Sequence, residues 1–120
     1  MAKSTLSFSS ILAWLLAAFF LVGSYGNAFI TADYAAAYAR WGYPDWFHYL
    51  TAALELAAAL LLIGSGTRIC GAGLGAVVMS AATLTTLANG DYSHTTAPAI
   101  VLLVSLTVLA LSLSARRRTA

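Results

Sequence analysis

The sequence predicts an all-α integral membrane protein, a four-helix bundle with an interfacial helix between the first and second spans. Its 120 residues are 61% hydrophobic and only 8% charged, which is more apolar surface than a soluble domain of this length can bury. Four apolar stretches of about 17 to 20 residues each match a hydrocarbon core ~30 Å thick. None of them alternates with the period of two that membrane strands require.

Short connections join these stretches, so the whole chain is interpreted as a single four-helix transmembrane domain. Pro44 is expected at the first position of the second span and Asp45 in its first turn, where a carboxylate complements the helix dipole. The run Asn89–Asp91 ends the third span, and Pro98 opens the fourth. The expected bounds are 1–120 for the domain and 11–30, 46–63, 69–88 and 98–114 for the spans.

The first connection is the longest and predicts a helix of its own. Tyr34, Tyr38 and Trp41 recur at i, i+4 and i+7 and so share one stripe of a helix. Gly42 follows at the position where a glycine commonly ends a helix. We expect this helix to lie on the outer membrane surface, with its aromatic side chains as interface anchors. Alternatively, some of them roof a pocket.

The basic residues predict the orientation. With four spans, Lys3, Arg68 and the run Arg116–Arg118 fall on one side of the membrane. Because positive charge accumulates on the cytoplasmic side, we expect both termini to be cytoplasmic in a bacterial-type inner membrane. The arginine run is interpreted as this topology anchor and not as a nucleic-acid site. The other two connections carry the residues Asp33, Arg40, Asp45 and Asp91.

The third span contains small residues at a spacing typical of close helix packing. Gly71 and Gly75 form a small-xxx-small pair, which lets two helix backbones approach each other. Packing within one chain and a homodimer seam would both use this pattern.

Glu55 is the residue that most clearly predicts a function. It lies at the middle of the second expected span, where a charged side chain costs about 2.5 kcal/mol or more and usually marks a functional site. Burial favours the protonated form of a carboxyl, so Glu55 is interpreted as a buried acid or base. His48 and Tyr25 are the expected second proton partners, His48 because it shares the helix stripe of Glu55. A purely structural role for Glu55 remains the alternative.

Polar side chains gather in the outer halves of the first three spans, whereas the inner halves have few. This distribution predicts a cavity that reaches from the outer face down to Glu55. His48, His94, Asp45 and Asp91 could meet at its mouth but lack metal-ligand spacing, so no metal is predicted. The expected ligand-binding residues are Asn27, Trp46, Thr51, Thr86, Asn89 and His94.

The chain resembles the DoxX-like family of small four-helix membrane proteins. The resemblance rests on Gly42-Tyr43-Pro44 before the second span, Glu55 within it, the Leu-Leu-Ile-Gly exit ending at Gly64, and the basic turn at Arg68. The family is named for a subunit tied to thiosulfate:quinone oxidoreduction, and its fold is similar to that of sterol-isomerase and sigma-2-like membrane proteins. The resemblance therefore implies a lipophilic ligand and proton transfer, without fixing a reaction or a cofactor.

Three functional hypotheses follow. The first is the binding of a lipophilic small molecule (quinone, terpenoid or sterol-like), with acid–base chemistry of the isomerase type or quinone-linked redox chemistry. The second is a proton-coupled exporter resembling the small multidrug resistance proteins, although their glutamate lies in the first helix. The third is a non-catalytic subunit of a membrane oxidoreductase complex. The expected partners are membrane lipid, a lipophilic small molecule, and either a second copy of the chain or a membrane redox protein.

Overall fold

A computed structural model describes residues 7–119, and its regular structure is entirely helical within that range. The all-α prediction, with four apolar helices and a short helix between the first two, is confirmed. Lys3, on which part of the orientation prediction rests, lies outside the described residues. The elements in chain order are α1 (Phe8–Ala28), α2 (Ala32–Arg40), α3 (Phe47–Ile63), α4 (Arg68–Ala88), a 3₁₀ turn η1 (Tyr92–His94) and α5 (Thr96–Thr119).

The apolar helices have the length and composition of membrane spans. Within the described residues, α1, α4 and the segment that contains η1 and α5 are long and apolar enough to cross a bilayer. Helix α3 is equally apolar but shorter, with 17 residues. The chain is thus an integral membrane protein by the character of its helices.

Local sequence signals set the ends of the two N-terminal helices. Ser7 caps α1 by accepting a hydrogen bond from the Ser10 backbone N–H at 3.1 Å, and Thr31 caps α2 in the same way. After α2, Gly42 adopts a φ of +90°, which a residue with a side chain rarely does. The predicted end of the interfacial helix at Gly42 is therefore confirmed.

The prediction that Pro44 opens the second span is wrong. Helix α3 begins at Phe47, and Pro44 lies in the preceding turn. Its carbonyl oxygen accepts a hydrogen bond from the Phe47 N–H at 3.0 Å, so the proline closes a turn instead of starting the helix. Asp45 consequently lies outside the first turn of α3. Pro98 falls at the third residue of α5, where an N–H would lack an intrahelical partner in any case.

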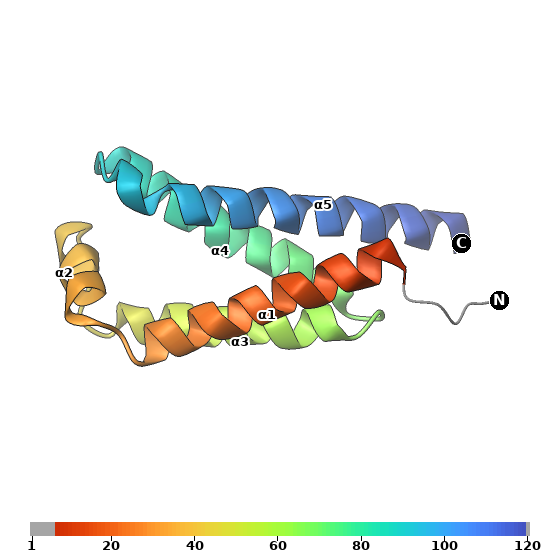
Figure 1. Ribbon diagram of the computed structural model, residues 1–120, viewed down its shortest axis with the longest axis horizontal. Helices are drawn as coiled ribbons and strands as arrows, with labels where there is room; N and C mark the ends of the chain where they lie inside the picture. Colours follow the sequence, from red (N-terminus) through yellow and green to blue (C-terminus); the bar gives the residue numbers. More distant parts are fainter. Residues whose placement is uncertain (1–6, 120) are drawn as a thin grey trace.

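The four long helices form a bundle that is tight at one end and splayed at the other. Helix α1 packs mainly on α3, α3 on α4, and α4 on α5. Figure 1 shows α1 and α5 close together at the end where α1 begins and α5 finishes, here called the termini end. They diverge toward the opposite end, where α2 lies crosswise. This second end is called the α2 end.

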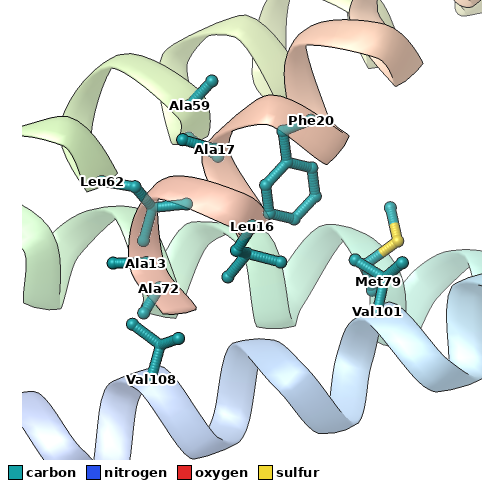
Figure 2. Packing of buried hydrophobic residues seen from close by; sticks show 11 residues of the cluster. Ala13, Leu16, Ala17, Phe20, Ala59, Leu62, Ala72, Met79, Val101 and Val108 are labelled. Atoms are coloured by element: carbon teal, nitrogen blue, oxygen red, sulfur yellow. The ribbon is translucent and has the colours of Figure 1, made fainter. Parts of the chain in front are cut away.

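The hydrophobic core fills the middle of the bundle and its termini end. Figure 2 shows Leu16 and Ala13 of α1 near Ala72 of α4 and Val108 of α5, with Leu62 of α3 beside them. These side chains are at most 2% exposed. The close packing leaves the splayed α2 end as the place where a cavity can form.

The glycines of α4 are used for packing within the chain. A Cβ atom added at Gly71 would lie 2.7 Å from the backbone nitrogen of Leu62, so the backbones of α3 and α4 meet here. At Gly75, an added Cβ would lie 2.7 Å from the Phe20 ring of α1. Both glycines are buried within the single chain. Of the two predicted alternatives, the contacts agree with packing within one chain.

Side chains from α4 and α1 satisfy the last carbonyls of α3. The guanidinium of Arg68 is buried and donates from Nε to the Leu62 carbonyl at 3.1 Å and from Nη2 to the Ile63 carbonyl at 3.4 Å. Its Nη1 donates to Ser10 Oγ of α1 at 3.2 Å, and Trp14 Nε1 donates to the Ile63 carbonyl at 3.1 Å. Since helix ends leave carbonyls without intrahelical partners, these bonds allow α3 to end inside the bundle.

Candidate functional site

A cavity of about 310 Å³ lies between the splayed helices at the α2 end. Aliphatic and aromatic side chains of α1, α4 and α5 make up most of its wall, among them Phe20, Met79 and Val101. Five of the residues predicted for the site also line it, and these are Asn27, Thr51, Glu55, Thr86 and His94. The helix pairs α1–α3 and α4–α5 thus enclose an apolar space with a few polar groups on its wall.

Glu55 is joined to helix α2 by a series of hydrogen bonds. Its side chain is buried in the wall, with only 6% of the residue exposed. Oε1 accepts a hydrogen bond from Asn27 Nδ2 of α1 at 2.8 Å, and Asn27 Oδ1 accepts one from the Tyr38 hydroxyl of α2 at 2.7 Å. Asn27 Nδ2 also donates to the Gly23 carbonyl at 3.0 Å, which satisfies the amide.

Tyr38 of α2 is the first donor in this series of hydrogen bonds. Burial raises the pKa of its phenol above the usual 10.0, so the hydroxyl keeps its proton at neutral pH and donates to Asn27. The direction of each hydrogen bond from Tyr38 to Glu55 is then fixed. Tyr38 donates to the amide oxygen, and the amide nitrogen donates to the carboxyl of Glu55.

A glycine in α1 makes room for the carboxyl of Glu55. A Cβ atom added at Gly23 of α1 would lie 2.6 Å from Glu55 Oε2. The carboxyl therefore occupies the space that any other residue at position 23 would fill. Gly23 and Glu55 both line the cavity, and the absence of a side chain at Gly23 lets the carboxyl lie against α1 at the cavity wall.

His48 approaches Asn27 from the side away from the cavity. Its Nδ1 lies 2.6 Å from the Asn27 carbonyl oxygen, and because a carbonyl only accepts, Nδ1 carries the proton. The imidazole borders a separate pocket of about 160 Å³ together with Tyr38 and Asp45. His48 therefore contacts the backbone of Asn27, but it does not line the cavity that holds Glu55.

Three other predicted site residues lie away from the cavity. Tyr25 is 69% exposed and its ring packs on Phe29 at 4.9 Å, because two residues along a helix turn a side chain about 200° away from Asn27. Trp46 is 59% exposed in the turn before α3. Asn89 is exposed and donates to the Thr85 carbonyl at 2.8 Å, which caps the end of α4.

A second polar cluster surrounds Asp91, in the connection between α4 and α5. Its carboxylate accepts hydrogen bonds from Arg40 Nη2 at 3.2 Å, Trp41 Nε1 at 3.0 Å, Ser93 Oγ at 3.2 Å and His94 Nδ1 at 2.8 Å. The bond from His94, with the other donors, lowers the pKa of Asp91 to about 2. Asp91 thereby fastens the end of α2 to the α4–α5 connection, beside the cavity.

Most of the chain is similar to a known protein family. Residues 11–108 match the DoxX-like family. The chain belongs to the DoxX-like family. The matched range contains every residue that lines the cavity. No curated protein and no solved structure matches this DoxX-like chain.

The candidate site of this DoxX-like protein includes residues that sequence reasoning did not select. Tyr38 and Gly23 both contact the Glu55–Asn27 pair. The aromatic stripe was one available signal, because roofing a pocket was one of its two predicted roles, and Trp41 does line the cavity together with Tyr34. Gly23 gave no signal, since a glycine in an apolar helix has many uses.

The four residues considered for a metal do not assemble. Asp91 and His94 meet, whereas His48 and Asp45 border a different pocket. Among residues 7–119 no three histidine, cysteine, aspartate or glutamate side chains come close enough to hold a metal ion together.

Proposed function

We propose that this DoxX-like protein binds a lipophilic small molecule, of the quinone, terpenoid or sterol-like kind, in the cavity, and that Glu55 exchanges a proton with it. The observation that carries the proposal is a buried carboxyl on the wall of a largely apolar cavity of about 310 Å³. Small-molecule sites typically combine an apolar wall with a few convergent polar groups. An ionisable side chain at membrane depth usually marks such a site.

The surroundings of Glu55 suit proton exchange. Asn27 holds one carboxyl oxygen, while Oε2 lies against the gap at Gly23. A protonated Glu55 would donate to a carbonyl or hydroxyl of the ligand, and the ionised form would accept a proton back. Both isomerase-type and quinone-linked chemistry need such a group.

The size and position of the cavity indicate which part of the ligand it holds. Ligand cavities usually measure roughly 300 to 1,000 Å³, so this one suits a ring system and not a whole long-chain lipid. Phe19 and Val22 of α1 line it and are 61% and 72% exposed, which places part of its wall at the bundle surface. An apolar tail would therefore extend outward beside α1, into the surrounding lipid.

Native mass spectrometry of the protein, extracted together with its lipids, tests the proposal. We expect the wild type to retain a small molecule. Glu55→Gln should fold normally, but it should either retain much less of that molecule or no longer convert it. The reason is that the amide keeps the volume of the carboxyl but cannot exchange its proton. Retention of the molecule by Glu55→Gln without turnover would assign a binding site with Glu55 as the reacting group. Full activity in Glu55→Gln would contradict the proposal.

A further inference from the structure

His94 belongs to the same cavity as Glu55 but comes from a different part of the chain. Glu55 projects from α3, whereas His94 ends η1, between α4 and α5. Its imidazole stands edge-on to two aromatic rings, with centroids 5.3 Å from Tyr34 of α2 and 5.7 Å from Trp41, which follows α2. The ring is therefore held in place on the cavity wall by packing as well as by hydrogen bonding.

Asp91 decides which nitrogen of His94 carries the proton. Four donors surround the Asp91 carboxylate, so it is ionised at neutral pH and can only accept. His94 Nδ1, at 2.8 Å, must then be the donor in that bond. In the neutral imidazole this leaves the lone pair on Nε2, which makes no hydrogen bond within residues 7–119.

We propose that His94 Nε2 is a second proton-exchanging contact for the ligand, that Asp91 is its positioning residue, and that the ligand carries a hydroxyl of the phenol or enol type at this end. The inference rests on the proposed function, because it assumes that the cavity holds a ligand. It adds a substrate class, namely a lipophilic ring compound with one oxygen function for Glu55 and an acidic hydroxyl for His94.

The proton transfer is balanced without any further reactant. The ligand O–H bond breaks and an N–H bond forms at Nε2, which gives an imidazolium and a phenolate or enolate. The charged groups around the ring are Asp91, which favours the imidazolium, and Arg40, which shares the same carboxylate at 3.2 Å. Tyr34 presents an edge of its ring to His94. Return of the proton restores both partners.

The tautomer of His94 can be measured directly. The chain has two histidines, so the full-length protein in lipid nanodiscs, labelled with ¹⁵N-histidine, should give two sets of ring signals. We expect neutral His94 to be protonated at Nδ1 in the wild type. In Asp91→Asn it should shift toward the Nε2-protonated form, because the acceptor loses its charge. The His48 signals serve as the internal reference, since His48 bonds to a backbone carbonyl.

The ligand contact is tested with 4-hydroxybenzophenone and with benzophenone, which lacks the hydroxyl. We expect the hydroxyl compound to shift the His94 Nε2 signal and to bind about tenfold more weakly to His94→Phe, the effect of losing one hydrogen bond. Benzophenone should bind the wild type and His94→Phe equally. Tyr92→Phe is the matched control, because Tyr92 is exposed in the same 3₁₀ turn.

The outcomes separate the two proposals. Equal binding of both compounds to the wild type and to His94→Phe, without any shift at Nε2, would overturn the role of His94 and leave the cavity as a ligand site. An unchanged tautomer in Asp91→Asn would overturn the positioning role of Asp91. Binding of neither compound would overturn the proposed function and this inference together.

Discussion

At the scale of single residues, the site depends on one carboxyl with a defined set of neighbours. Glu55 is held by Asn27, which is in turn held by Tyr38 and by the Gly23 carbonyl. A buried polar group costs free energy unless it is hydrogen-bonded. The amide of Asn27 lowers this cost for Glu55 while leaving Oε2 beside the cavity wall.

Replacing Gly23 by alanine should disturb the carboxyl but not the fold. The new Cβ would lie 2.6 Å from Glu55 Oε2, the far end of a flexible side chain, so the carboxyl can move away. We expect little change in melting temperature. Ligand binding should weaken about tenfold, since the displaced carboxyl of Glu55 would lose its oriented hydrogen bond to the ligand. The infrared band of the carboxyl, with Glu55→Gln as the blank, should shift.

Gly26→Ala is the control for this prediction. Gly26 lies on the same helix, and an added Cβ meets nothing within 4 Å. An identical carboxyl band in Gly23→Ala and the wild type would contradict the close approach of α1 to Glu55.

Much of the residue-scale prediction came from depth in the membrane. Glu55 stands out because a carboxylate in an apolar span needs a reason, and Asn27 and Thr86 were selected from their place in the outer half. Both of these line the cavity. Depth carries no information on the direction in which a side chain points, and Tyr25, two residues from Asn27, faces outward for that reason.

At the scale of elements, α2 is placed by contacts that are distant in sequence. Its last residue, Arg40, and Trp41, which caps it, donate to Asp91, which lies some fifty residues further along the chain. Tyr38 reaches back from α2 to Asn27 of α1. The aromatic period of the sequence predicted the helix but not its partners, because a stripe of aromatic residues suits a membrane interface and a cavity roof equally well.

The seam between α3 and α4 gives an element-scale prediction. Gly71→Ala should destabilise the bundle by about 1 to 3 kcal/mol, because the added methyl group would press on backbone atoms that cannot move aside easily. Gly73→Ala should be neutral or stabilising, since an added Cβ there meets nothing within 4 Å and alanine favours a helix. Thermal unfolding in detergent measures both. Equal melting temperatures for the two variants would argue against the seam.

At the scale of the whole molecule, the cavity is a result of how the helix pairs diverge. The termini end is closed by alanine, leucine and valine side chains and by Arg68, whereas the α2 end is bridged mainly by α2 and its contacts (Figure 1). The four apolar helices could be predicted from the sequence, because their length and apolar character are set by the bilayer. The divergence depends on packing between helices, which hydropathy does not encode.

The orientation in the membrane is a prediction at the same scale. Ser65 lies in the α3–α4 turn next to Arg68, and Ser93 lies in η1. With cytoplasmic termini, Ser93→Cys should react with a membrane-impermeant thiol reagent added to intact cells, and Ser65→Cys should react only after permeabilisation. The native Cys70 is replaced by alanine in both variants. The reverse labelling pattern would invert the topology and turn the α2 end toward the cytoplasm.

The unequal helix lengths have a consequence for the surrounding bilayer. With a rise of 1.5 Å per residue, the 17 residues of α3 span about 25 Å, whereas the 21 residues of α1 and of α4 each span about 31 Å. A hydrocarbon layer of roughly 30 Å therefore matches α1 and α4 but exceeds α3. At the end of this shorter helix, Arg68 and Trp14 donate hydrogen bonds to its last carbonyls. We expect the membrane to thin locally beside α3, the helix that carries Glu55 on its buried side.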